Sequence, residues 1–463
     1  MSKVVRFPRS LTIFTLAMIN VAAIGSVKNW PFTAEYGLGA LFFLALAALV
    51  FFFPVSLVAA ELATGWPKQG GIYVWVREAF GHRVGFLAIS LLWIENVIWY
   101  PTILSFIAAT ITYTFNPALA ENTHYTVIMV LVLFWTATLA NLFGMRLSGW
   151  ISSVGAFCGT MIPGTLIIVL GVLWYFQGNP IEIPLTVKGL IPHFQFNDLV
   201  FFTGVLLALA GMEMSSVHAR DVKNPQRDYP RAIFLSAALI LGLSLLGVLS
   251  IAMVIPQKEI SLVSGAMQAL SIFMERYNLR HLVPWVAALI AIGAFGSVST
   301  WIIGPSKGLL AAAEGGDLPE SFRKVNQHHA PTALLLTQGI IVTFLSITFV
   351  LMPTVSSAFW ILTVLVAQLY LVMYILMFAS AIALRYKKPD VERAYKVPGG
   401  KLGIWIVAGI GILGSAFALL IGYIPPEKIP IGSPRFYTTF LLIGTVVGCL
   451  VPILLPHLKR KKA

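Results

Sequence analysis

Charged side chains are scarce in this sequence. Only 11% of its 463 residues are Asp, Glu, Lys or Arg, whereas 58% are hydrophobic. A soluble protein carries roughly a quarter charged residues. The composition therefore excludes an ordinary soluble fold and predicts one all-α polytopic membrane domain that fills the chain.

Cysteine and histidine are also rare, which bears on enzyme chemistry. Cys158 and Cys449, the two cysteines, fall within apolar runs, so we expect buried small side chains and no disulfide or metal site. His193 and His281 lie in predicted loops and His218 at a predicted helix end. The sequence therefore offers no intramembrane His/Asp or Cys/His constellation that could activate a nucleophile. We expect no enzyme activity, metal or cofactor.

Acidic residues are outnumbered by basic ones, 18 to 31, which gives a net charge of +13. In a soluble chain this excess would suggest a nucleic-acid partner. Here 24 of the 31 basic residues fall in alternate inter-span segments and the two ends: 1–10, 68–83, 146, 220–231, 307–324, 385–401 and 459–462. This is the positive-inside pattern, so we expect both termini in the cytoplasm, contact with membrane lipid and no nucleic acid.

Long apolar runs are abundant, and each transmembrane helix needs about 20 such residues. On this measure the sequence predicts 12 transmembrane helices. Their approximate ranges are 11–36, 38–63, 84–112, 125–143, 150–176, 198–218, 231–254, 282–312, 331–352, 357–385, 403–423 and 437–457. The segment 65–81 is amphipathic, rich in glycine and too short to span, so we expect it to lie at the cytoplasmic interface.

Two of these spans contain small residues that weaken the helix. The first has Gly25, followed by Pro31, and the sixth has Gly211. The two sites are five spans apart, an odd number, so the two halves enter the membrane in opposite orientations. Interrupted helices at matching positions of inverted halves indicate a transporter site. We therefore expect a 5+5 inverted repeat, about 11–176 and about 198–385, plus two C-terminal helices at about 403–457.

Three ionisable residues, Lys28, Glu95 and Glu213, fall at membrane depth, where an isolated charge is costly. One hypothesis is that Lys28 forms a buried ion pair with Glu95 or with Glu213. The alternative is that its side chain extends to the extracellular interface. The sequence leaves both open.

Six motifs are spread along the chain: Pro67–Val76, Gly211–Glu213, Asn224–Pro230, Leu249–Pro256, Trp301–Gly308 and Val397–Gly400. Together they resemble the bacterial glutamate/γ-aminobutyrate antiporter family of the amino acid–polyamine–organocation superfamily, over nearly the whole length. The resemblance implies a multi-pass protein of the bacterial plasma (inner) membrane, a monomer or homodimer. It implies alternating-access exchange of an amino acid, such as glutamate or another acidic or polar one, for a related amino acid or its decarboxylated amine.

The resemblance also implies site residues. Backbone N–H groups of the broken first helix would meet the substrate carboxylate, and carbonyls of the sixth helix would meet its amino group. The substrate-binding candidates are Ala23, Ile24, Gly25, Ser26, Ala208, Ala210, Gly211, Ser297, Trp301, Tyr370 and Tyr374. Candidates for gating and proton coupling are Glu213, Lys28 and Glu95.

The sequence departs from this family at two cavity positions. The acid-resistance glutamate antiporters carry a glutamate where Ser297 stands and a tyrosine where Lys28 stands. An extra positive charge would favour a substrate with an acidic side chain. Two other functions remain open: a proton- or sodium-coupled amino-acid symporter of the same fold, and a transporter-like amino-acid sensor.

Overall fold

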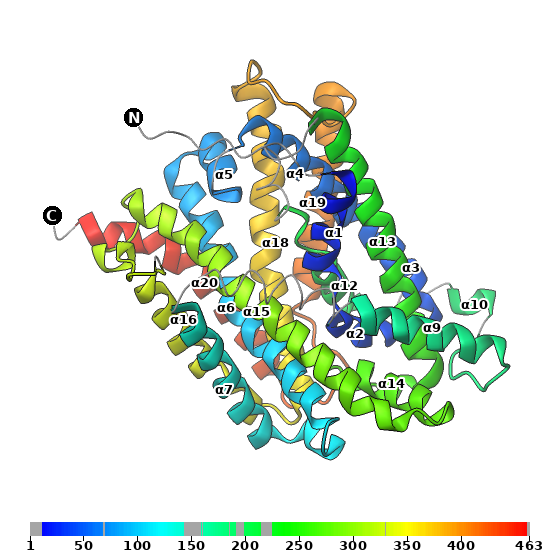
Figure 1. The fold of residues 1–463 in the computed structure, drawn as a ribbon. Coiled ribbons are helices and arrows are strands. Elements are labelled where there is room, and N and C mark those ends of the chain that lie inside the picture. Colours follow the sequence, from blue (N-terminus) through cyan, green and yellow to red (C-terminus); the bar gives the residue numbers. More distant parts are fainter. Residues whose placement is uncertain are drawn as a thin grey trace.

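A computed structural model describes residues 12–67, 70–142, 159, 161–184, 186–190, 199–213, 225–328 and 330–460. All regular secondary structure in these ranges is helical. The bundle is drawn in Figure 1. Nine helical segments among the described residues are long and apolar enough to cross a membrane. The polytopic prediction is therefore confirmed, while the full count of 12 and the inverted repeat stay predictions.

The first half of the bundle follows the predicted ranges closely. Its helices are α1 (Ile13–Ile24), η1 (Val27–Asn29), α2 (Trp30–Ala34), η2 (Gly37–Gly39), α3 (Ala40–Ala47), the π-helical turn η3 (Ala48–Phe52), α4 (Phe53–Gly65), α5 (Ile72–Phe80), α6 (His82–Thr112), η4 (Pro117–Glu121), α7 (Thr123–Leu142) and α9 (Ile162–Phe176). The segment from η2 to α4 is one continuous span. Part of the predicted span 150–176 lies outside the described residues.

The second half contains the longest helices. Within the described residues, all its helices are α10 (Val187–Leu190), α12 (Phe202–Ala208), α13 (Pro225–Val254), η7 (Gln257–Glu259), α14 (Gly265–Arg276), η8 (Arg280–Leu282), α15 (Val283–Glu314), η9 (Glu320–Arg323), α16 (Thr332–Leu345), α17 (Thr348–Leu351), α18 (Val355–Lys387), α19 (Gly400–Ile421) and α20 (Pro434–Arg460). The predicted span 198–218 is described only as far as Glu213.

The core of the bundle is formed by α6 and α18, which pack against each other, with α15 beside α6 (Figure 1). In both α6 and α18, 83% of the most apolar stretch is buried inside the protein, against 28% in α20. The outer helices α19 and α16 instead expose large apolar side chains such as Leu413 and Phe344. This distribution suits a helical bundle surrounded by lipid, because its outer face need not be polar.

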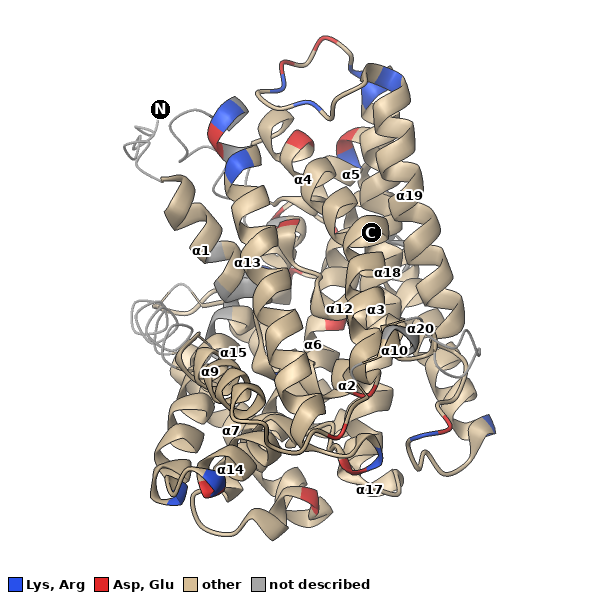
Figure 2. Cartoon of the chain, turned by 90° about the vertical axis from the view of Figure 1, so that its right-hand side faces the viewer, with Lys and Arg blue, Asp and Glu red and all other residues tan. Residues whose placement is uncertain are grey.

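The predicted interfacial segment is the nine-residue helix α5, which is too short to span. It packs against α6 and α18 at one end of the bundle, hereafter the α5 end. Lys388 there forms an ion pair with Glu78, and His82 one with Asp317. In the view of Figure 2, charged residues gather mainly toward the two ends of the bundle. Basic segments predicted on one side of the membrane, 68–83, 307–324 and 385–401, thus meet at the same end.

Candidate functional site

The first transmembrane helix is interrupted where the sequence predicts. Helix α1 ends at Ile24, and the Gly25 N–H still donates to the Val21 carbonyl at 2.7 Å. Ser26 is extended, with φ −140° and ψ 122°, before η1 begins. Among the described residues, the backbone N–H groups of 26–28 donate to no backbone carbonyl. Helical bonds use the N–H groups up to residue 25, so the backbone donors left over at this break are those of 26–28.

The sixth span is interrupted at the second predicted position. Helix α12 ends at Ala208, and Gly211 has a φ of +118°, a conformation that side chains disfavour. Its N–H donates to the Tyr374 hydroxyl at 2.9 Å. The Leu206 and Leu207 carbonyls accept the N–H groups of Leu209 and Ala210, and the chain leaves the helix at this point. The break therefore places polar backbone groups at the middle of the bundle.

Gly211→Ala should lower the stability of the folded protein by about 1–3 kcal/mol, because a Cβ strains a backbone with positive φ. Thermal unfolding in detergent measures the effect. Gly409→Ala is the matched control: it lies within α19, with open space around its Cα. That change should be neutral or stabilising. Equal unfolding temperatures for both variants would contradict the assigned backbone conformation.

A cavity of about 100 Å³ lies between the two breaks and helices α6, α15 and α18. That is room for several waters or one small solute. Ten predicted site residues line it: Ile24, Gly25, Ser26, Lys28, Glu95, Ala208, Ala210, Ser297, Trp301 and Tyr370. Gly211, Glu213 and Tyr374 do not line it, and the side chain of Ala23 is not among those that the structure describes. Polar and aromatic lining residues that the sequence did not single out include Asn29, Asn96 and Trp99.

Lys28 is only 3% exposed, so its side chain does not reach the extracellular interface. Its Nζ donates to Thr102 Oγ1 at 2.9 Å and lies 5.2 Å from the centre of the Trp99 ring and 5.4 Å from that of Phe359. A hydroxyl and two aromatic faces thus surround this ammonium, and not the Glu95 or Glu213 carboxylate suggested as partner. The reason is that the break in the first span directs residue 28 toward the part of α6 beyond Glu95.

Glu213 is buried beside the cavity and held by two tyrosines. The Tyr370 hydroxyl donates to Oε1 at 2.5 Å and the Tyr374 hydroxyl to Oε2 at 2.6 Å. The two rings are stacked, with centroids 4.7 Å apart, because i and i+4 share one face of α18. Tyr370 also lines the cavity, so it connects the solute space to Glu213. This network ties the α12 break to α18.

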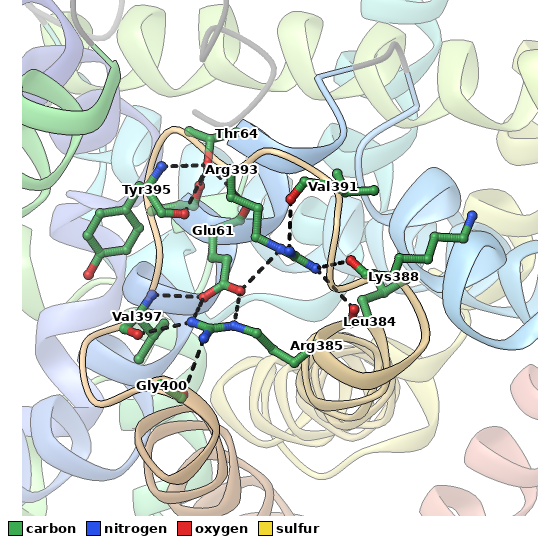
Figure 3. Close-up of polar contacts among 11 residues, drawn as sticks. Glu61, Thr64, Leu384, Arg385, Lys388, Val391, Arg393, Tyr395, Val397 and Gly400 are labelled. Atoms are coloured by element: carbon green, nitrogen blue, oxygen red, sulfur yellow. Dashed lines mark hydrogen bonds and ion pairs between the residues drawn. The ribbon is translucent and has the colours of Figure 1, made fainter.

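A second polar centre lies at the α5 end and was not foreseen from the sequence. Glu61, 1% exposed, accepts bonds from Arg385 Nε and Nη2 at 2.5 and 2.6 Å, and lies 3.4 Å from Arg393 Nε (Figure 3). It also accepts the Val397 N–H at 2.8 Å. We call Glu61, Arg385 and Arg393 the Glu61 cluster. It fixes the loop between α18 and α19 to the end of α4.

Comparison with known proteins agrees with this architecture. The family model described as amino acid permease matches residues 9–447. An uncharacterised transporter of Legionella pneumophila is 48% identical over 442 residues, covering 96% of this chain and 95% of the relative. A glutamate/γ-aminobutyrate antiporter of Lactococcus lactis is 36% identical, covering 98% and 92%. A probable agmatine/putrescine antiporter of the same species is 25% identical, covering 90% and 89%. The resemblance read from the motifs is confirmed, and the chain belongs to the amino acid permease family of the amino acid–polyamine–organocation superfamily.

Proposed function

We propose that this chain is an amino-acid antiporter of the bacterial inner membrane that exchanges an acidic amino acid for a related amino acid or its decarboxylated amine. The observation that carries the proposal is the cavity between two broken helices, with the buried ammonium of Lys28 in its wall. One of the three ammonium hydrogens is used by Thr102. The others are available to an anion, and a buried cation without an anion is costly.

A solute in this cavity would meet three kinds of group. Its α-carboxylate would accept from the N–H groups of 26–28, and its amino group would lie near the carbonyl end of α12. A side-chain carboxylate would bind Lys28. Trp301, whose ring lies 5.9 Å from that of Trp99, would close over the solute. The relationship to a glutamate/γ-aminobutyrate antiporter supports the same substrate class.

The test is exchange in proteoliposomes loaded separately with single amino acids or amines. We expect labelled glutamate to enter only when a matched solute is inside. Accumulation in empty vesicles under a proton or sodium gradient would replace the antiporter with the symporter of the same fold. Binding without any transport would favour the sensor.

Lys28→Met should reduce glutamate uptake about tenfold or more, because one charge-assisted bond to the side-chain carboxylate is lost. Uptake of a neutral amino acid should change much less. Lys258→Met is the control, since Lys258 is exposed in η7, outside the cavity. If glutamate and the neutral amino acid lost uptake equally, Lys28 would have no role in recognising an acidic side chain.

A further inference from the structure

Two polar side chains in the cavity wall each have a buried oxygen that accepts no hydrogen bond from the described residues. Glu95 and Asn96 are adjacent on α6, and each is 3% exposed. Glu95 Oε1 and Asn96 Oδ1 are buried and accept no hydrogen bond among the described residues. Both residues line the cavity. A buried carboxylate oxygen without a donor is costly, so this pair of acceptors indicates a ligand that brings its own donors.

Glu95 and two residues that contact Lys28 lie along one face of α6. Glu95, Trp99 and Thr102 are spaced by four and three residues, which places them above one another on the helix. The Thr102 hydroxyl accepts a hydrogen bond from the Lys28 ammonium, and the same ammonium lies over the Trp99 ring. Glu95 is seven residues from Thr102, so their Cα atoms are about 10 Å apart along the axis. The cavity thus has a positive end and a negative end.

We propose that Glu95 and Asn96 form a binding subsite for the primary ammonium group of the solute, opposite the carboxylate subsite at Lys28. An ammonium has three donors and no acceptor, which matches two acceptors that lack donors. The C-terminal end of α12, whose residues Ala208 and Ala210 also line the cavity, adds partial negative charge.

The separation of the two ends selects the length of the solute. A chain with three methylene groups between its ammonium and its carboxylate covers about 5 Å when extended, from ordinary bond lengths. A hydrogen bond of about 2.9 Å at each end brings the total to about 11 Å. Such a solute offers a carboxylate to Lys28 and an ammonium to Glu95 from opposite ends of one chain, whereas an α-amino acid with an apolar side chain carries both charges on one carbon.

This inference rests on the proposed antiporter function and explains how one cavity accepts both exchange partners. Glutamate and γ-aminobutyrate share the distal carboxylate and the amino group. They differ only in the α-carboxylate, which decarboxylation removes. The charges that Lys28 and Glu95 would recognise are therefore those present in both solutes.

The first test uses the unaltered protein and reads binding separately from transport. Trp99 and Trp301 line the cavity, so their fluorescence reports occupancy in detergent. We expect affinity among ω-amino acids to peak at about three methylene groups. N-acetyl-γ-aminobutyrate, which lacks the ammonium, should bind about tenfold more weakly or worse. Equal affinity for γ-aminobutyrate and its acetylated form would overturn the subsite, whatever the exchange assay shows.

The second test changes the charge of the subsite. Glu95→Gln should weaken γ-aminobutyrate binding about tenfold or more, and strengthen binding of glutarate, which has a second carboxylate in place of the ammonium. Glu275→Gln, at an exposed glutamate on α14, is the control and should change neither. If Glu95→Gln bound γ-aminobutyrate as tightly as the unaltered protein does, the proposed role of Glu95 would be refuted. The proposed function fails separately, if binding is intact but no solute is exchanged.

Discussion

Glu61→Gln is expected to destabilise the folded protein by about 3–5 kcal/mol, the usual consequence of removing one partner from a buried ion pair. The change leaves Arg385 and Arg393, with side chains 10% and 2% exposed, facing each other without an anion. Burial lowers the pKa of Arg393, and the Glu61 carboxylate opposes that shift while Arg385 adds to it. The Glu61 carboxylate thus offsets the repulsion between the two guanidinium groups at this site.

Thermal unfolding of the purified protein in detergent measures this effect. Lys388→Gln is the matched control, because it removes an ion pair with Glu78 at the same end of the bundle but at a side chain that is 39% exposed. Exposed pairs contribute about 0–1 kcal/mol. Adding Arg385→Gln to Glu61→Gln should recover part of the loss, since fewer unpaired charges remain. An unfolding temperature for Glu61→Gln as high as that of Lys388→Gln would show that the cluster does not hold the loop.

The double replacement Tyr370→Phe and Tyr374→Phe is expected to slow exchange about 100-fold or more. Both hydroxyls donate to the Glu213 carboxylate, and a hydrogen bond to a charged group contributes about 1.5–3 kcal/mol. Tyr374 also accepts the Gly211 N–H, so the break in the sixth span loses a contact to α18. Initial rates of solute exchange in proteoliposomes measure the change.

Glu213→Gln distinguishes the charge of this residue from its position. If protonation of Glu213 biases opening of the cavity, the amide variant should exchange at a rate that varies little with pH. Tyr374→Phe alone keeps the carboxylate and should keep a pH dependence, at a lower rate. A pH profile of Glu213→Gln parallel to that of the unaltered protein would remove Glu213 from proton coupling.

The positions of the helix breaks could be predicted from the sequence because their cause is local. Gly25 follows a run of small residues and Gly211 adopts a backbone conformation open mainly to glycine. The apolar runs likewise predicted, by length alone, the approximate ranges of the nine spans found among the described residues. The amphipathic segment before the third span is the helix α5, as its short length and polarity predicted.

The partners of buried charges could not be predicted, because they come from distant parts of the chain. Arg385 is 324 residues from Glu61, and the basic residues of 385–401 were already explained by topology. Thr102 gave no signal as the partner of Lys28, since a hydroxyl in a membrane helix usually bonds to its own backbone. Helix packing decides which face of α6 lines the cavity, so only the structure identifies Asn96 and Trp99 as lining residues.

The setting of Lys28 has a consequence for the return step of the transport cycle. Its ammonium is surrounded by a hydroxyl and aromatic rings, and no carboxylate among the described residues forms an ion pair with it. A bound solute would itself pair with this ammonium and with the Glu95 carboxylate in the same cavity, so both buried charges would be paired in the loaded carrier and neither in the empty one. Reorienting empty would require moving two unpaired charges through a closed, low-dielectric intermediate. One-for-one exchange would then follow from the high energy barrier to reorienting the empty carrier, without a separate coupling ion.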